Sequence, residues 1–149
     1  PRYLREVTLP AVERGLAKAG RRREDFEILC PVFTRVAGSA ERFETQTRAL
    51  RQQVAFYAST PAYRGVLELH GWGELQGELN RMSKLGRWAE MGERIGEDML
   101  DVFCLTAEPA HLAEALLTRC AGAVDRVLDG FALDDPEQRA EQVAKLRAG

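Results

Sequence analysis

Cationic and polar side chains gather in one glycine-rich stretch of the sequence. They are Arg64, His70, Lys84 and Arg87, and glycines at positions 65, 71, 73, 77, 86, 92 and 96 break the segment around them into short pieces. Guanidinium and ammonium groups bind carboxylates and phosphates. The four residues are therefore candidates for binding an anionic or polar group of a substrate or cofactor. The alternative is that they are solvated cations and a histidine in a surface turn.

Two further groups of residues in this stretch could bind a ligand or a metal. Trp72 and Trp88 could line a pocket for a flat ring, or they could pack in the core or at a domain contact. Glu97, Asp98 and Asp101 crowd one predicted helix start. Acidic residues are favoured in a first helical turn by the helix dipole, so we interpret them as part of the helix and predict no metal site.

Sequence motifs for catalysis are absent. The chain contains no G-x-G-x-x-G, no Walker loop, no H-E-x-x-H and no G-x-S-x-G, so catalytic residues cannot be named from it. His111 lies near a predicted helix start without a second ligand at useful spacing, which favours a structural role. The three cysteines, at positions 30, 104 and 120, lack C-x-x-C spacing and predict free buried thiols in a reducing cytoplasm.

Composition and net charge indicate which kinds of macromolecule the chain would bind. The 149 residues carry a net charge of −2, with 45% hydrophobic and 30% charged residues, which is typical of a soluble globular domain. This charge gives no general attraction to nucleic acid or to a membrane surface. The basic run Arg21-Arg22-Arg23 stands alone and is interpreted as a solvated loop after a helix. We therefore expect neither nucleic acid nor membrane as a partner.

Two segments have the composition of β-strands, Phe26–Thr34 and Asp125–Phe131. The first is nearly continuous in apolar residues, which predicts a strand covered on both faces. Pro31 within it predicts a bulge or a missing hydrogen bond of the ladder.

Helical periodicity fills most of the remaining chain. Leu4–Ala19 is predicted to be helical with a kink or break near Leu9, caused by Pro10, and to end at Gly20. Ser39 is predicted to cap a long helix. The apolar stripe of that helix is expected to comprise Phe43, Leu50, Val54 and Tyr57. Shorter helices are expected over residues 62–69, 75–86, 88–95 and 99–103, then from Pro109 with Leu112, Leu116 and Leu117 inward, and from Pro136 with Val143 and Leu146 inward.

The connection between the two predicted strands is much longer than a parallel crossover needs. A crossover takes about a dozen residues, whereas residues 35–124 separate these strands. Residues 58–104 therefore look like a helical insertion, and enlarged loops are where binding residues tend to lie. Two strands also leave two open sheet edges. We expect further strands from the rest of a longer chain or from self-association, and the start at Pro1 without a methionine suggests a fragment.

The run YASTPAYRGVLELHGWGELQGELNRMSKLGRWAEMGERIGEDMLDVF, preceded by YLREVTLPAVERGLAKAGR, resembles the C-terminal part of the deazaflavin-dependent subgroup of the luciferase-like monooxygenase superfamily. The resemblance implies an α/β fold, the C-terminal fragment of a (β/α)8 barrel, with two parallel strands and a large helical insertion. Residues 1–149 would form one partial domain, from barrel helix six to helix eight. Phe26–Thr34 would be strand seven and Asp125–Phe131 strand eight.

The resemblance also implies a reaction and a coenzyme. The expected function is hydride transfer between coenzyme F420, a 5-deazaflavin, and a small organic substrate. Barrel enzymes place their sites at the C-terminal ends of the strands, which would put Thr34, Arg35, Gly130 and Phe131 near the mouth, with the insertion as a lid. An isolated fragment is expected to be inactive. Two alternatives stay open, namely an FMN-dependent monooxygenase and a non-enzymatic helical module that self-associates through its strand edges.

Overall fold

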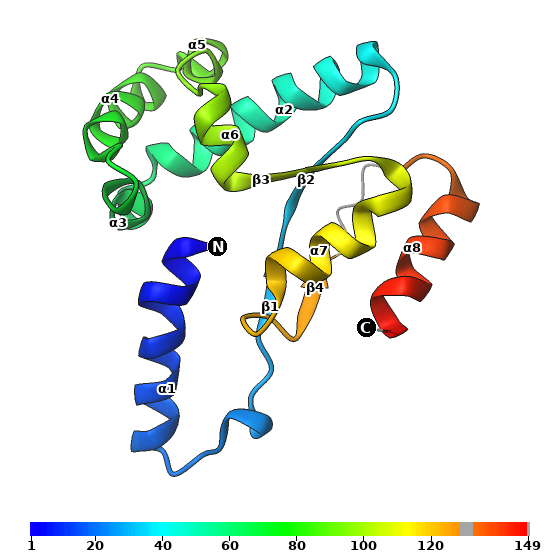
Figure 1. The fold of residues 1–149 in the computed structure, drawn as a ribbon. Coiled ribbons are helices and arrows are strands. Elements are labelled where there is room, and N and C mark those ends of the chain that lie inside the picture. The colour runs from blue at the N-terminus through cyan, green and yellow to red at the C-terminus, as the bar shows by residue number, and fades with distance from the viewer. Residues whose placement is uncertain (129–132, 149) are drawn as a thin grey trace. The chain divides into compact units, whose positions relative to one another are not determined.

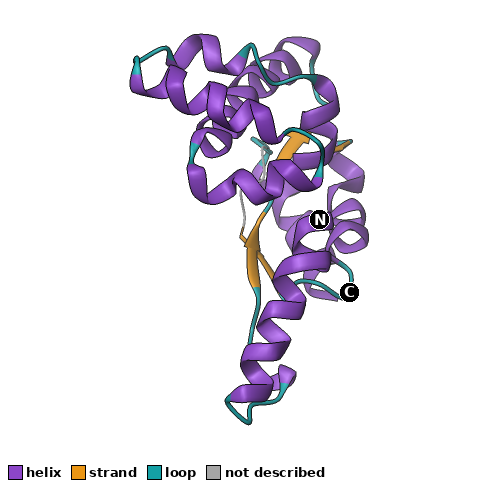
Figure 2. Ribbon diagram, turned by 90° about the vertical axis from the view of Figure 1, so that its left-hand side faces the viewer, coloured by secondary structure: helices purple, strands orange, loops and turns teal. Residues whose placement is uncertain are grey.

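The computed structural model describes residues 1–128 and 133–148. The chain divides into two compact units. Unit 1 comprises residues 1–37 and 105–149, and unit 2 comprises residues 38–104. Helices make up most of both units, and the strands are short (Figure 2).

Unit 1 combines helices with short strands. Its elements are α1 (Leu9–Lys18), β1 (Leu29–Pro31), β2 (Phe33–Val36), α7 (Leu112–Cys120), β4 (Arg126–Leu128) and α8 (Pro136–Ala148), together with β3 (Cys104–Ala107), which begins at the boundary between the units. β1 pairs with β4, and β2 pairs with β3. Unit 2 is helical and contains α2 (Ala40–Ser59), α3 (Arg64–Leu69), α4 (Gly73–Lys84), α5 (Trp88–Gly92) and α6 (Glu97–Phe103) (Figure 1).

The prediction of one continuous strand over Phe26–Thr34 is wrong. The segment forms two short strands, β1 and β2, which belong to different sheets and separate after Pro31. Proline has no N–H group for the ladder, so a change of partner at this point loses little. β1 is also more exposed than predicted, since 46% of Leu29 is accessible. The part of β2 that lies in the predicted segment matches better, because Thr34 is buried and Phe33 is half-buried.

The pairing of the first and last predicted strands is parallel, as expected. Leu29 lies opposite Arg126, Cys30 opposite Val127, and Pro31 opposite Leu128. The last predicted strand begins one residue later than expected, and its residues 129–131 lie outside the described part of the chain. The strand β3 was not predicted.

Asp125 holds the starts of β1 and β4 together. Its Oδ2 accepts hydrogen bonds from the Arg23 guanidinium and from the Ile28 N–H, both at 2.7 Å. These two hydrogen bonds lower the pKa of the Asp125 carboxyl, the bond from the Ile28 N–H having the larger effect. In the other direction, the N–H groups of Asp125 and Arg126 donate to the Ile28 carbonyl. The N-terminal ends of the parallel strands are thus fixed by side-chain as well as ladder bonds.

The first helix is not broken at Leu9; a π-helical stretch stands just before the predicted kink or break. Residues Leu4–Thr8 form a π-helical turn that runs directly into α1, and the N–H of Leu9 donates to the Leu4 carbonyl. The helix is therefore wider there but not broken. Gly20 ends it with a φ of 62°, and the Arg21 N–H reaches the Leu16 carbonyl at 3.0 Å, a closing bond of the Schellman type.

The long helix α2 begins as predicted and carries most of the contacts of unit 2. The Ser39 hydroxyl accepts a hydrogen bond from the Arg42 N–H, as an N-cap does. Leu50 and Val54 are buried, but Tyr57 is 39% exposed, so its place in the predicted stripe is wrong. The buried face continues at Ala58 instead, four residues after Val54.

α4 and α5 pack along α2 (Figure 1). Leu79, Met91, Ile95 and Leu100 are fully buried in this unit. The amides of Gln76 and Asn80 both donate to the Ser59 carbonyl, at 3.1 and 3.0 Å. These bonds satisfy the carboxyl end of α2 and fix α4 against it.

The core of unit 1 lies between α7, α8 and the strand β2. Val36, Leu112, Leu116 and Leu133 form its buried centre, and Val143 and Leu146 pack against them from α8, as predicted. Leu117 was predicted to face inward but is 38% exposed. It follows Leu116 directly, so the two side chains point about 100° apart around the helix.

Candidate functional site

Two of the four predicted site residues are already paired with carboxylates. Arg64 Nε lies 2.7 Å from Glu68 Oε1 on α3, and the guanidinium of Arg87 forms two hydrogen bonds with Glu90 on α5. The hydrogen bond that each arginine donates to its carboxylate raises the pKa of that arginine, and the same contact lowers the pKa of Glu90. Both pairs are exposed and lie within one helix or at its start. An anionic ligand at either guanidinium would compete with the local carboxylate for the positive charge.

Lys84 differs from these arginines. It is exposed in the last turn of α4, where a cation is favoured by the helix dipole. Among residues 1–128 and 133–148 its ammonium group has no ion pair or hydrogen bond. Of the three predicted cations, Lys84 is therefore the one whose charge is open to an incoming anion.

His70 lies in a cluster of rings at the end of α3. Its imidazole stacks on the Trp72 indole with 5.4 Å between centroids and 21° between planes. Phe103 approaches both rings at 5.8 Å. We call His70, Trp72 and Phe103 the ring cluster. All three side chains are half-buried, so the cluster is neither a solvated turn nor a closed core. Gly71, with a φ of 82°, forms the tight turn between His70 and Trp72.

Trp88 has a different environment. It is 50% exposed, and its nearest aromatic neighbour is Phe56, at 6.1 Å between centroids. The four predicted site residues thus lie in separate local settings: Arg64 and Arg87 with their own glutamates, Lys84 in solvent, and His70 among rings.

The residues predicted at the barrel mouth are described only in part. Thr34 and Arg35 are buried in β2, and Arg35 Nε donates to Thr106 Oγ1 of β3 at 3.1 Å. Gly130 and Phe131 lie outside the described residues. The Arg35–Thr106 hydrogen bond was not predicted, because β3 was not predicted.

The acidic residues at the start of α6 and His111 were the remaining candidates. Glu97 forms an ion pair with Arg51 at 2.7 Å, and Glu97 and Asp98 lie in the first turn of α6. Within the described ranges, no three His, Cys, Asp or Glu side chains are arranged to hold a metal ion. His111 is exposed at the start of α7. No helix in the described part of the chain has both the length and the apolar character needed to cross a membrane.

The three cysteines are free, as predicted, but only Cys104 is buried. Cys30 and Cys120 are half-buried. Burial, and to a smaller extent the neighbouring Cys30, raise the pKa of the Cys120 thiol. A raised pKa keeps the thiol protonated, which disfavours a nucleophilic role.

Comparison with known proteins identifies the family. Residues 1–126 match the luciferase-like monooxygenases. The chain therefore belongs to the luciferase-like monooxygenase family.

Several individual proteins are similar in sequence to this chain. Uncharacterized proteins of Mycobacterium bovis and Mycobacterium tuberculosis are 49% identical over 130 residues, which cover 87% of this chain and 38% of theirs. A 5,10-methylenetetrahydromethanopterin reductase of Archaeoglobus fulgidus is 25% identical over 144 residues, covering 93% of this chain and 42% of the reductase. The chain thus spans about two fifths of the length of these relatives. No solved structure gave a significant match.

Proposed function

We propose that this chain is part of a luciferase-like oxidoreductase that transfers a hydride between a deazaflavin coenzyme and a small organic substrate. The observation that carries the proposal is the family match over residues 1–126. The similarity to a protein named as a reductase supports reduction as the reaction type. The chain spans only part of its relatives, so the activity is proposed for the full-length protein.

We further propose that β1 and β4 are neighbouring strands of a (β/α)8 barrel, strands seven and eight. Their parallel register supports this, because neighbouring strands of such a barrel are parallel. In this arrangement α1 corresponds to barrel helix six and α2 to helix seven. Residues 58–104 would be an insertion on the way to strand eight. The exposed Leu29 and Leu128 side chains would then be covered by the rest of the barrel.

Two separate places in unit 2, at opposite ends of α4, offer the kinds of group that an anionic coenzyme with a ring system would contact. Lys84 offers an ammonium group with no partner among the described residues, and the ring cluster offers half-buried flat side chains beside an imidazole. When bound, the coenzyme supplies the hydride chemistry. This chain's own part would be to bind an anionic group through Lys84, to orient a ring, and to keep water from the reacting atoms.

Lys84 gives the proposal a sharp test in the full-length protein. Reduced coenzyme F420 is mixed anaerobically with a panel of substrates, beginning with 5,10-methylenetetrahydromethanopterin, and the return of the oxidised deazaflavin absorbance is followed. With a substrate that turns over, Lys84→Ala should raise KM, for the coenzyme or for the substrate, by about tenfold or more and leave kcat nearly unchanged. The reason is that the substitution removes a charged contact made in the ground state and the transition state alike.

Lys18→Ala is the matched control, since Lys18 is also an exposed lysine in the last turn of a helix. It should leave both constants unchanged. Equal kinetics of wild type and Lys84→Ala would remove Lys84 from the site. Failure of every substrate to reoxidise the coenzyme would count against the proposed reaction.

The FMN-dependent monooxygenase is the second candidate function. The name of the matched family favours it, because it describes oxygenation rather than reduction. The two candidates differ in the coenzyme that the full-length protein binds.

A further inference from the structure

Two of the three cysteines, Cys30 and Cys120, take no part in the proposed reaction and face the same layer of unit 1. Cys30 is the middle residue of β1 and lies opposite Val127 of β4. Residues paired in register point to the same face of a sheet, and Val127 packs against the core that contains Leu116 of α7. The residues on either side of Cys30 in β1 point to the other face and are exposed. Cys30 therefore points toward α7.

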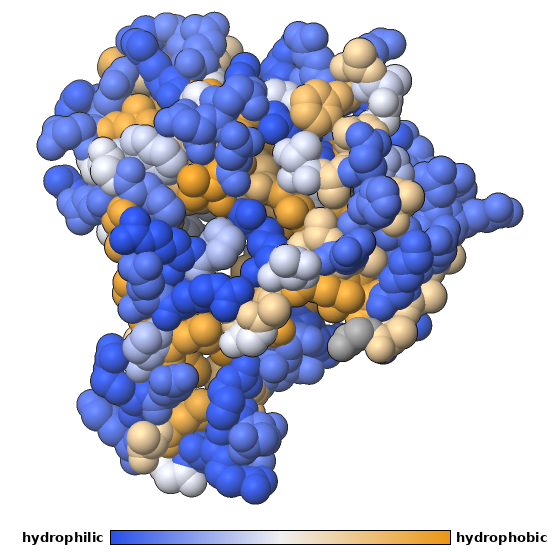
Figure 3. Space-filling model, viewed as in Figure 1, coloured by the Kyte–Doolittle hydropathy of each residue, from blue (hydrophilic) through white to orange (hydrophobic). Residues whose placement is uncertain are grey.

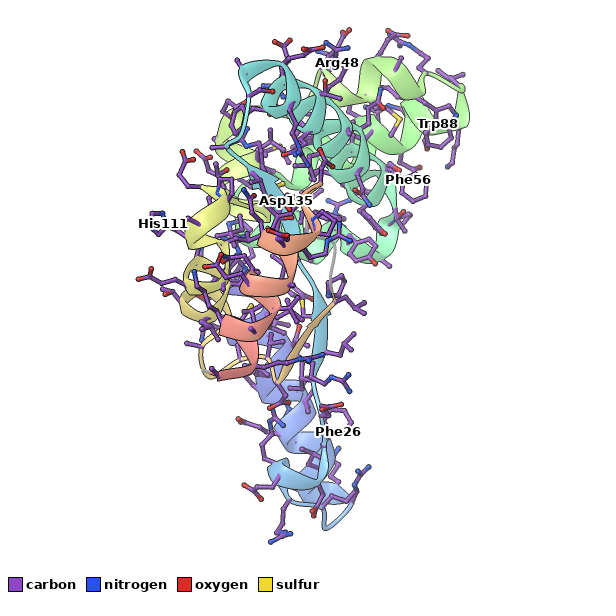
Figure 4. All side chains as sticks on the ribbon, turned by 90° about the vertical axis from the view of Figure 1, so that its right-hand side faces the viewer. Phe26, Arg48, Phe56, Trp88, His111 and Asp135 are labelled. Carbon is purple, nitrogen blue, oxygen red and sulfur yellow. The ribbon has the colours of Figure 1, made fainter. Side chains whose placement is uncertain are left out.

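Cys120 approaches the same layer from the helix. It is the last residue of α7 and follows Leu116 by four positions, so the two side chains lie on one face of the helix. Figure 4 labels Phe26, just before β1, and His111, just before α7, and the two lie far apart along the strands. α7 therefore runs back along β1, as Figure 1 also shows, and ends near the start of that strand.

A tight turn places Cys120 at the level of Cys30. The Cys120 carbonyl accepts hydrogen bonds from two N–H groups of the turn that follows it, at 2.9 and 3.2 Å. The chain then reaches β1 directly, because the Asp125 N–H donates to the Ile28 carbonyl at 2.9 Å. Ile28 is two residues before Cys30. The two cysteines thus face each other across the layer between the strands and α7.

The electrostatic interaction of the two sulfurs agrees with this placement. Burial is the main cause of the raised pKa of Cys120, and the charge of Cys30 adds to it, whereas the charges of Arg119 and Arg5 act in the opposite direction. The Arg5 guanidinium also donates to the carbonyls of Arg119 and Ala121, at 3.1 and 3.0 Å. The backbone on both sides of Cys120 is therefore held in place.

Small molecules in water can reach this layer. Cys30 and Cys120 are both free and only half-buried. Figure 3 shows apolar side chains open to solvent in the lower part of the view, where Figure 1 places α1 and β1. The layer is therefore not sealed by polar residues on this side.

We propose that Cys30 and Cys120 form a reversible disulfide with a low-molecular-weight disulfide, such as oxidised glutathione, as the oxidant. The thiolate of one cysteine attacks a sulfur of the small disulfide, and one glutathione leaves as its thiolate. The thiolate of the other cysteine then attacks the protein sulfur of this mixed disulfide and displaces the second glutathione. Two protein thiols are oxidised, one small disulfide is reduced, and the two protons end on the two glutathione thiols.

The disulfide would join β1 to the end of α7. It would close a loop that contains residues 31–119 and therefore the whole of unit 2. A cross-link that closes a long loop restricts the unfolded chain strongly, so the oxidised protein should be the more stable form. In a reducing environment the thiols stay free. The proposal does not depend on the reaction or the coenzyme.

Oxidation of the full-length protein, mapped by mass spectrometry, tests the proposal. The reduced protein is incubated with about 5 mM oxidised glutathione at about pH 8.5, where more of each thiol is ionised. It is then alkylated and digested with trypsin, which releases Cys30 in the peptide 24–35 and Cys120 in the peptide 120–126. The two peptides should appear as one cross-linked species, two hydrogens lighter than their sum, and should separate again after treatment with dithiothreitol.

Thermal melting of the same samples measures the effect of the bond. Oxidation should raise Tm of the wild type by about 5 °C or more. Cys30→Ala and Cys120→Ala should lose both the cross-link and this rise. The matched control is Cys104→Ala, which removes the third, buried cysteine and should keep both.

If an alanine variant does not fold, Cys30→Ser or Cys120→Ser replaces it with the same expected result. Peptides with single glutathione adducts only, or thiols that stay unreacted, would overturn the proposal, because the two sulfurs would then not reach each other. A cross-linked protein whose Tm does not rise would contradict it as well.

Discussion

Leu79→Ala is expected to lower the free energy of unfolding by about 2–5 kcal/mol. Leu79 lies on α4 and has no exposed surface. α4 packs against α2, the longest helix of unit 2. Removing the side chain loses its burial from water and leaves a cavity that the neighbouring helices can fill only in part. Urea unfolding followed by circular dichroism measures the change.

Leu85→Ala is the control for this substitution. It deletes the same atoms from a side chain that is 71% exposed, six residues further along, and should change stability by less than about 0.5 kcal/mol. Because the chain has two units, hydrogen exchange should locate the loss, with amides of α2 and α4 exchanging faster and those of α7 unchanged. Equal effects of the two substitutions would mean that the packing of unit 2 is not as described.

Gln142→Ala should destabilise unit 1 by about 2–3 kcal/mol. Gln142 lies on α8 and is 1% exposed. Its Oε1 accepts a hydrogen bond from the Ala113 N–H at 3.0 Å, and its Nε2 donates to the Ala110 carbonyl at 3.4 Å. One side chain therefore satisfies a donor and an acceptor at the start of α7. The alanine variant leaves the buried Ala113 N–H without a partner and also opens a cavity.

Thermal unfolding of two further variants separates these causes. Gln142→Leu fills the space but cannot hydrogen-bond, so it should retain a loss of about 1–3 kcal/mol. Gln138→Ala, on an exposed position of the same helix, should have almost no effect. A Gln142→Leu variant as stable as the wild type would show that the hydrogen bonds contribute little.

Features fixed by neighbouring residues were predictable from the sequence. Gly20 and Ser39 end and begin helices as expected, because a left-handed glycine and a capping hydroxyl act within one turn. The effect of Pro10 was predicted only in part, because the helix is π-helical before it and is not broken. The parallel pairing of the outer strands was also confirmed. It joins distant residues, and it was expected from the alternation of helices with strands, which is typical of a parallel sheet.

Features that depend on distant residues were not predictable. β3 is four residues long and directly follows a helix, so it shows no periodicity of its own. The burial of Tyr57 and Leu117 was misjudged because each lies at the border of an apolar stripe, where the neighbouring element decides exposure. Gln142 was overlooked because a polar residue on a charged helix gives no sign that it will cap another helix.

In the candidate site, too, contacts between neighbouring residues were predictable and contacts between distant residues were not. Glu68 is four residues after Arg64 and Glu90 three after Arg87, so both ion pairs follow from helical spacing. That spacing signal was present in the sequence. The contact of His70 with Phe103 spans 33 positions and required the fold. Lys84 stays the strongest of the four candidates, since it is the cation without a carboxylate partner among the described residues.

Equilibrium titration of the full-length protein with coenzyme F420 and, separately, with FMN tests the proposed function most directly. Quenching of the coenzyme fluorescence reports binding. We expect coenzyme F420 to bind with a dissociation constant of about 10 μM or lower, and FMN to bind at least about tenfold more weakly. Tighter binding of FMN, or no binding of either at about 1 mM, would contradict a deazaflavin-dependent oxidoreductase.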